Sequence, residues 1–200
     1  VSLLVREPSY WSNVLPMEES AMITREIQAS GMDLRLNCEL KQIIDGGAGE
    51  AVAVETSTGD RIDCQVVGLT AGVSPNKAIA ERSGIACGRG VLTDWSMRSQ
   101  TTDVWAAGDC AEIVNEGDAR NTIEQVWYTG KAQGLIAAES MVGQDSTYDQ
   151  GIWFNSAKFL DIEYQTYGQV GFHLDGEQQI FWEDQAAKRL FRIVHIDGRI

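Results

Sequence analysis

The hydrophobic and polar pattern at the beginning of the chain predicts a β-α-β unit. Residues 1–5 form an almost continuous apolar run, which is typical of a strand buried on both faces. Residues 17–30 carry apolar positions at helical spacing, with acidic residues in the first turn and Gly31 as a stop. Residues 34–38 then predict a second strand. This order favours a parallel sheet.

The next segment has the pattern of an antiparallel meander. Residues 39–44, 51–57 and 61–65 are short runs with strand composition. The connections between them, 45–50 and 58–60, are rich in Gly and Asp. Such connections favour tight hairpin turns.

The middle of the chain returns to longer apolar segments. We expect strands over residues 66–71, 91–94 and 103–107, and helices over residues 77–83 and 123–142. The second helix carries a row of small residues, which would let it lie close to a sheet.

Aromatic residues crowd the last fifty positions of the chain. Residues 178–182 and 190–196 alternate between apolar and polar positions, which predicts an antiparallel sheet. His173 and His195 are interpreted as strand residues rather than catalytic groups. The aromatic side chains favour a core or a subunit interface, and we therefore expect a homo-oligomer.

Charge and length exclude several classes of protein. The 200 residues contain 16 Lys plus Arg against 29 Asp plus Glu, a formal net charge of −13. This balance argues against a nucleic-acid partner, because a phosphate backbone would be repelled. No apolar run reaches the roughly 18 residues of a membrane span, so no membrane partner is expected. The start at Val1 has neither an initiator Met nor the features of a signal peptide, which suggests a chain cut from a longer one.

The cysteines show no short redox or metal-binding spacing. Cys38, Cys64, Cys87 and Cys110 lie far apart in the sequence, without a C-x-x-C pair. We interpret them as free thiols of a reducing compartment, which predicts a cytoplasmic protein with no metal site.

Two short motifs carry most of the functional information. The first is Thr70-Ala-Gly-Val-Ser-Pro-Asn76, and the second ends in Val104-Trp-Ala-Ala-Gly-Asp109. Together with Gly90-Val-Leu-Thr-Asp94 and the helix ending at residues 137–143, they resemble the pyridine nucleotide-disulfide oxidoreductases. In that family the first motif closes the NAD(P)-binding domain, and the second supplies an aspartate that binds the ribityl chain of FAD.

The resemblance implies a fold and a domain order. The expected fold is α/β, with partial doubly wound, Rossmann-like FAD- and NAD(P)-binding domains and a C-terminal α+β interface domain. Residues 1–72 would be the back half of the NAD(P)-binding domain, 73–143 the second segment of the FAD-binding domain, and 150–200 the beginning of the interface domain. The family's G-x-G-x-x-G turns and its C-x-x-x-x-C pair are absent, and we expect them before Val1. Ser99 replaces the usual Thr of the second motif, a small departure because the hydroxyl is kept.

The resemblance also implies a set of cofactor-binding residues. Asp109 would accept a hydrogen bond from a ribityl hydroxyl, and Gly108 would let the backbone approach the ligand closely. Gln125 and Val126 lie where the following helix would begin, with its positive end toward the flavin pyrimidine ring. Gly72 would line the nicotinamide side of the domain junction.

Nucleotide preference is read at the end of the first strand, and the signal is divided. An acidic residue there binds the adenosine ribose, whereas an arginine accommodates a 2′-phosphate. Val5 occupies the usual acidic position, and Arg6 and Glu7 follow it. The choice between NADH and NADPH therefore stays open, as does a simple solvated pair of charges.

Two functions are compatible with these features. The first is part of an FAD-dependent oxidoreductase, similar to the ferredoxin, rubredoxin and nitrite reductase-like branch. It would transfer a hydride from NAD(P)H to FAD and pass electrons to a disulfide, an iron protein or oxygen, with an electron-acceptor protein as a partner. The second is a non-catalytic scaffold or oligomerisation fragment without a cofactor. No catalytic residue is assigned.

Overall fold

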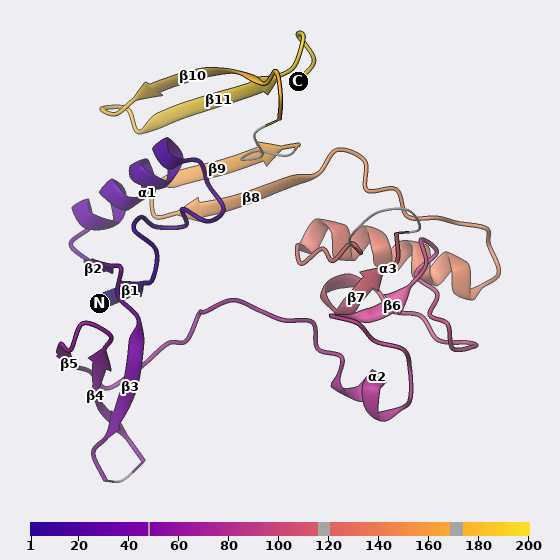
Figure 1. The fold of residues 1–200 in the computed structure, drawn as a ribbon, viewed down its shortest axis with the longest axis horizontal. Coiled ribbons are helices and arrows are strands. Elements are labelled where there is room, and N and C mark those ends of the chain that lie inside the picture. The colour runs from indigo at the N-terminus through magenta and orange to yellow at the C-terminus, as the bar shows by residue number, and fades with distance from the viewer. Residues whose placement is uncertain (48, 116–120, 169–173) are drawn as a thin grey trace. The chain divides into compact units, whose positions relative to one another are not determined.

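The computed structural model forms two compact units. One unit contains residues 1–69 and 156–200, and the other contains residues 70–155. The structure describes residues 1–47, 49–115, 121–168 and 174–200 (Figure 1). His173 lies outside these residues, and the division into three domains stays a prediction.

The predicted β-α-β unit is confirmed in the first unit. Strand β1 (Ser2–Val5) and strand β2 (Asp33–Leu36) pair in parallel, and helix α1 (Met17–Ala29) connects them. The helix begins after Pro16, and Gly31 follows its end with a φ of +81°. That left-handed conformation is easily accessible to glycine, which explains why the helix stops there.

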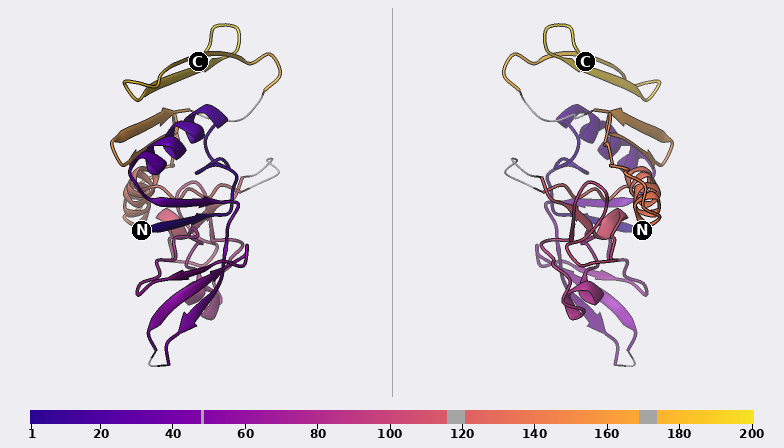
Figure 2. Two further views of the ribbon diagram at one scale, coloured as in Figure 1. Left: turned by 90° about the vertical axis from the view of Figure 1, so that its left-hand side faces the viewer. Right: turned by 90° about the vertical axis from the view of Figure 1, so that its right-hand side faces the viewer.

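The antiparallel meander is also confirmed. Strands β3 (Leu40–Asp45), β4 (Ala51–Thr56) and β5 (Arg61–Asp63) form a three-stranded sheet in that order (Figure 2). In the first turn the Asp45 carboxylate accepts hydrogen bonds from the backbone amides of residues 47 and 49.

The prediction of a strand over residues 66–71 was wrong. This segment is extended chain without ladder pairing, and Val66 and Leu69 are 85% and 70% exposed. A strand requires hydrogen bonds to a neighbouring strand. Among the described residues no strand pairs with this segment, so its apolar composition alone does not make it one.

The predicted C-terminal antiparallel strands are confirmed as one hairpin, and the structure contains a second hairpin before it that was not predicted. Strands β8 (Phe154–Phe159) and β9 (Ile162–Tyr167) form one pair, and β10 (Gln178–Asp184) and β11 (Arg189–His195) form the other. His195 is the last residue of β11, in agreement with its interpretation as a strand residue. The described residues from 150 onward contain no helix.

Helix α1 holds both hairpins through different contacts. Its apolar face, with Ile23 and Ile27, packs with Leu15 against partly buried aromatic side chains of β8 and β9. On its polar side, Glu19 and Glu18 accept hydrogen bonds of 2.7 Å from Arg192 of β11. These carboxylates, Glu19 above all, raise the pKa of the Arg192 guanidinium.

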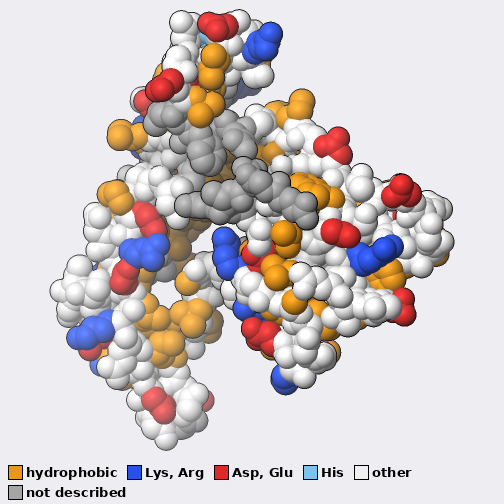
Figure 3. Space-filling view, turned by 45° about the vertical axis from the view of Figure 1, so that its right-hand side comes forward, with side chains coloured by type: hydrophobic (Ala, Val, Ile, Leu, Met, Phe, Trp, Pro, Cys, Tyr) orange, Lys and Arg blue, Asp and Glu red, His pale blue; other side chains and the backbone are white. Residues whose placement is uncertain are grey.

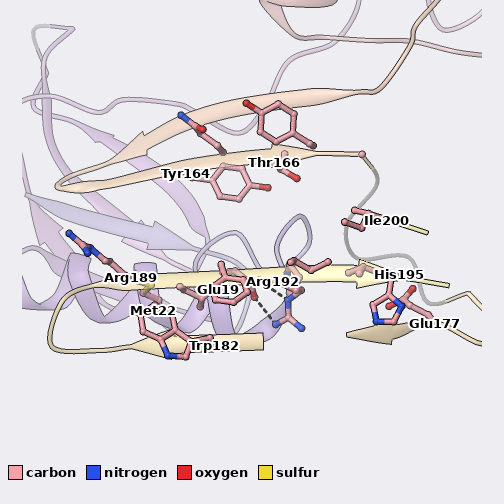
Figure 4. Close-up of a pocket in the computed structure, with 18 of the residues that line it drawn as sticks. Glu19, Met22, Tyr164, Thr166, Glu177, Trp182, Arg189, Arg192, His195 and Ile200 are labelled. Atoms are coloured by element: carbon pink, nitrogen blue, oxygen red, sulfur yellow. Dashed lines mark hydrogen bonds and ion pairs between the residues drawn. The ribbon is translucent and has the colours of Figure 1, made fainter. Parts of the chain in front are cut away.

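A groove of about 1200 Å³ lies between α1, β9 and β11 in this unit. Figure 4 shows Arg192 reaching toward Glu19 inside it, with Tyr164 and Thr166 on the opposite strand. Burial raises the pKa of Tyr164, which matches its partly apolar surroundings.

The second unit is built on two short parallel strands and a helix. Strands β6 (Val91–Thr93) and β7 (Ala111–Ile113) pair in parallel, after the short helix α2 (Ala78–Arg82). A 3-10 turn, η1 (Gly108–Cys110), precedes β7, and helix α3 (Trp127–Met141) follows it. The predicted helices and the strand at 91–94 are thus confirmed, although α3 begins later than residue 123.

The predicted strand over residues 103–107 was also wrong. This segment makes only an isolated antiparallel bridge, between Arg98 and Trp105. A tight turn containing Asp103, with a φ of +60°, folds the segment back on residues 97–99. The backbone groups are therefore used locally, and the parallel partner of β6 is β7 instead.

The core of the second unit gathers around Met97, whose side chain is completely buried. Ile113, Ala137 and Tyr148 complete the buried cluster, and Trp105 is among the partly buried side chains that pack against it. This core fixes α3 against β7 and the turn before it.

The surface of the described chain is mixed in character. On the face shown in Figure 3, acidic and basic side chains lie among apolar ones. Within the part of the chain that the structure describes, no helix combines the length and the apolar character needed to cross a bilayer.

Candidate functional site

The Gly108–Asp109 turn presents a carboxylate to solvent. Gly108 has a φ of +76°, a conformation that strains residues with a β-carbon. Asp109 is exposed, and its carboxylate makes no hydrogen bond or ion pair with the described residues. The turn therefore offers an acceptor that the described residues leave free.

Helix α3 lies directly against this turn. A Cβ built on Gly130, in the first turn of the helix, would be 3.4 Å from the Cα of Gly108. Two glycines facing each other allow this approach, because neither carries a side chain to separate the backbones. The row of small residues in α3 thus brings the helix to the turn beside β7.

The residues just before α3 leave polar groups available. Val126 is extended and forms the N-terminal boundary of the helix. The side-chain nitrogen Nε2 of Gln125 is buried and has no hydrogen-bond partner among the residues that the structure describes. Leaving a buried donor unpaired costs free energy, so a bound group with acceptor atoms fits this position. The unpaired amides at the start of a helix favour the same kind of ligand.

A buried hydrogen-bond network lies behind the turn. The backbone amide of Gly108 donates to Oε1 of Gln133 at 2.8 Å, and Nε2 of Gln133 donates to Oε2 of Glu124 at 3.0 Å. Tyr148 and Gln150 also donate to the Glu124 carboxylate. Burial, followed by the contact with Glu124, raises the pKa of the Tyr148 hydroxyl, which therefore stays a donor.

A second buried carboxylate supports the base of the turn from β7. Glu112 accepts hydrogen bonds from the backbone amide of Gly90 at 2.7 Å and from Asn121 at 2.9 Å. Burial alone would raise the pKa of Glu112, but these hydrogen bonds together with nearby Arg89 outweigh it and leave the pKa below its usual value.

The other predicted nucleotide-binding residues lie in separate segments. Arg6 and Glu7 follow β1 and form an ion pair of 2.8 Å, with Glu39 at 3.8 Å from Arg6. The hydrogen bond from Arg6 lowers the pKa of the Glu7 carboxyl. Gly72 is exposed in the coil of the second unit, with a φ of +102°. Of the predicted residues, four lie together where the turn before β7 meets the start of α3. They are Gly108, Asp109, Gln125 and Val126.

Sequence reasoning missed Gln133, Glu124 and Gly130 as parts of the site. One sequence feature could have indicated Gln133, namely a glutamine within the row of small residues on α3. A polar side chain on a close-packed helix face needs a hydrogen-bond partner. The partners come from residues 9 to 25 positions away, and the sequence pattern does not identify them.

Among the described residues, the cysteines form no disulfide and the acidic side chains form no metal-binding cluster. All four cysteines are free thiols. In the described part of the chain, no group of three or more His, Cys, Asp or Glu side chains is arranged to hold a metal ion.

Known proteins resemble this chain over most of its length. It is 28% identical over 180 residues to the 5,5'-dehydrodivanillate O-demethylase ferredoxin reductase subunit of Sphingobium sp., a match that covers 90% of the chain and 42% of that protein. It is 27% identical over 146 residues to the nitric oxide reductase FlRd-NAD(+) reductase of Escherichia coli, which covers 73% of the chain and 37% of that protein. The chain thus spans less than half the length of these relatives.

Solved structures share its α/β fold. A ferredoxin reductase from Rhodopseudomonas palustris superposes with a TM-score of 0.84 at 21% identity, over 99% of this chain and 48% of that one. A NAD-dependent persulfide reductase from A. fulgidus gives a TM-score of 0.81 at 16% identity, over 99% and 39%. Residues 1–134 also match the family model of the pyridine nucleotide-disulphide oxidoreductases. Because this match covers well over half of the chain, the protein belongs to the pyridine nucleotide-disulphide oxidoreductase family.

Proposed function

We propose that the chain is part of an FAD-dependent oxidoreductase that takes a hydride from NAD(P)H and passes electrons to an acceptor. The observation that carries this proposal is the Gly108–Asp109 turn. Its carboxylate is exposed and has no partner among the described side chains, and the turn is held against the start of a helix. Family membership supports the same assignment.

The residues around the turn fit the groups of a flavin. Asp109 accepts a hydrogen bond from a ribityl hydroxyl, and Gly108 leaves room for close backbone approach. Gln125 donates its unpartnered Nε2 to an acceptor atom of the ligand, and Val126 sets the start of α3, whose positive end favours negative charge. FAD, when bound, supplies the redox chemistry.

The end of β1 is the proposed contact for the nicotinamide nucleotide. Glu7 is ionised and presents acceptor oxygens for ribose hydroxyls, while Arg6 is 70% exposed and carries the charge needed for a 2′-phosphate. The two side chains bind each other, so either nucleotide must compete with that ion pair. Gly72 is proposed to line the nicotinamide side of the junction between the nucleotide-binding domains.

Replacing Asp109 with alanine is expected to weaken FAD binding about tenfold to hundredfold. A charge-assisted hydrogen bond is worth roughly 1.5–3 kcal/mol, and the variant loses one. The quenching of flavin fluorescence on titration with protein measures the dissociation constant. The titration should use a protein in which the nucleotide-binding sites are complete.

Asp145→Ala is the matched control for this experiment. Asp145 is another exposed aspartate of the second unit, and no hydrogen bond ties it to the turn. Its removal should leave the dissociation constant unchanged. Equal affinity of both variants and the unaltered protein for FAD would show that Asp109 is not a flavin ligand.

The acceptor is proposed to be a small electron-transfer protein in the cytoplasm. Both curated relatives described above are named as reductases of other redox proteins, a ferredoxin in one case and FlRd in the other. The four free thiols agree with a reducing compartment. A nucleic acid or a membrane is not proposed as a partner, because the net charge of −13 would repel an anionic surface.

A homo-oligomer is proposed through the exposed face of β10 and β11. Trp182 and Phe191 lie opposite each other in the ladder, with ring centroids 5.9 Å apart, and each is 46% exposed. Neighbouring Ile180 is 51% exposed. Apolar patches of this kind are typical of association surfaces. The same face would serve the alternative function, a non-catalytic assembly module.

Trp182→Glu is expected to shift the protein toward monomer, because it places a charge in the contact. Sedimentation velocity over a range of concentrations measures the change. Ile152→Glu, at a position that is 76% exposed outside this face, should leave the distribution as it was. A monomer at all concentrations before any substitution would contradict the proposal. If the protein forms oligomers but shows no flavin absorbance near 450 nm, the result would instead favour the alternative function, a non-catalytic assembly module.

A further inference from the structure

Gln133 is an unusual residue for its position. It lies within α3 and is 1% exposed, one of the most completely buried side chains of the described protein. A buried amide is unfavourable unless its donor and acceptor atoms are both paired. Here Oε1 accepts from the Gly108 amide and Nε2 donates to Glu124, so both ends of the side chain are used.

Glu124 determines which way the Gln133 amide points. Oε2 of Glu124 accepts hydrogen bonds from both Tyr148 and Gln133, so Gln133 turns Nε2 toward it. Its Oε1 is then left facing the Gly108 amide. Glu124 itself is 6% exposed and is held by Tyr148, which donates to the same oxygen at 2.8 Å, and by Gln150 on the other oxygen. The direction of the whole network thus follows from the acceptor oxygens of one buried carboxyl group.

The network ends at the residue next to the proposed flavin ligand. Gly108 is held against α3 by the hydrogen bond to Gln133 and by the close approach of Gly130. Asp109 follows immediately, with an exposed side chain. Fixing the Gly108 amide therefore fixes the path of the backbone that carries the Asp109 carboxylate.

We infer that Gln133, oriented by Glu124, is a positioning residue that presets the Gly108–Asp109 turn for flavin binding. This inference rests on the proposed function and deepens it. Neither side chain is a flavin ligand in this assignment. Their contribution is to hold the turn in its binding conformation before the ligand arrives, which lowers the ordering cost of binding.

The first test is Gln133→Met, which keeps the size of the side chain and removes the amide. Hydrogen exchange at the Gly108 amide, measured by NMR without flavin, should become about tenfold faster or more, because its acceptor is lost. The FAD dissociation constant should rise about tenfold, as expected for one hydrogen bond. Glu139→Gln on the same helix is the control, and it should change neither quantity. Far-UV circular dichroism checks that each variant is folded.

If Gln133→Met does not fold, exchanging the side chains at positions 124 and 133 provides a second test of the positioning role. Gln133→Glu alone places two carboxylates face to face in a buried site, which is strongly unfavourable. In the double variant Glu124→Gln with Gln133→Glu, the amide introduced at position 124 donates to the carboxylate introduced at position 133. That carboxylate still accepts from the Gly108 amide. The double variant should recover Gly108 protection and bring the FAD dissociation constant within about threefold of the original, since the charge-assisted bond is restored.

The possible results distinguish the positioning role of Gln133 from the proposed flavin-binding function. If the unaltered protein binds FAD and Gln133→Met binds it equally well with unchanged exchange at Gly108, the positioning role is refuted while the flavin assignment stands. A folded double variant with a protected Gly108 amide but lost flavin affinity refutes it as well. If the unaltered protein with complete nucleotide sites binds no FAD, the proposed function fails and the flavin role fails with it. Faster exchange in Gln133→Met would then show only that the network holds the turn.

Discussion

Met97→Ala is expected to lower the free energy of unfolding of the second unit by about 2–5 kcal/mol, because it leaves a cavity in a close-packed core. The Met97 side chain is 0% exposed and lies in the cluster with Ile113, Ala137 and Tyr148. Equilibrium denaturation in urea, followed by tryptophan fluorescence, measures the loss. Flavin affinity should fall with it at temperatures where the turn begins to loosen.

Met141→Ala supplies the comparison within the same unit. Met141 is the last residue of α3 and is 56% exposed, so its removal should change the free energy of unfolding by about 0.5 kcal/mol or less. Equal losses for the two variants would mean that Met97 is not part of a close-packed core.

The fold was predictable wherever a strand with a clear hydrophobic pattern has its pairing partner nearby in the sequence. The unit from β1 to β2 and the meander from β3 to β5 each combine apolar periodicity with a turn or cap that allows only one connection. Residues 66–71 and 103–107 have equally apolar composition, yet neither joins a sheet. Strand formation depends on the availability of a hydrogen-bonding edge, which composition does not record.

The candidate site was predictable only in its exposed part. The resemblance pointed to Gly108 and Asp109, and these residues do form a turn with an exposed carboxylate. The supporting network was not visible, because Gln133 and Glu124 are polar residues whose sequence context does not distinguish a buried position from a solvated one. Their burial results from tertiary contacts with Gly108 and Tyr148, and it is this context that turns ordinary polar residues into parts of a site.

Glycine positions show the same dependence on tertiary context, and Gly90 gives the sharpest case. It is buried just before β6, and its amide donates to Glu112 at 2.7 Å. A Cβ at this position would be 2.7 Å from the backbone oxygen of Cys110 and 3.1 Å from the Cβ of Glu112. Neither atom can move away without disturbing the pairing of β6 with β7. Gly90→Ala is therefore expected to destabilise the second unit by about 3 kcal/mol, at the upper end for an overpacked site.

Gly134→Ala is the matched substitution, with the opposite expected sign. Gly134 lies within α3, it is exposed, and a Cβ there would meet nothing within 4 Å. Alanine at such a helix position stabilises by roughly 0.5–1 kcal/mol, because the unfolded chain loses less entropy on folding. Urea denaturation of both variants should therefore separate them by about 4 kcal/mol, the sum of these two effects. If Gly90→Ala were as stable as Gly134→Ala, the strand pair that supports the Asp109 turn could not be packed as closely as described. The turn would then lack the rigid base on which a preset flavin ligand depends.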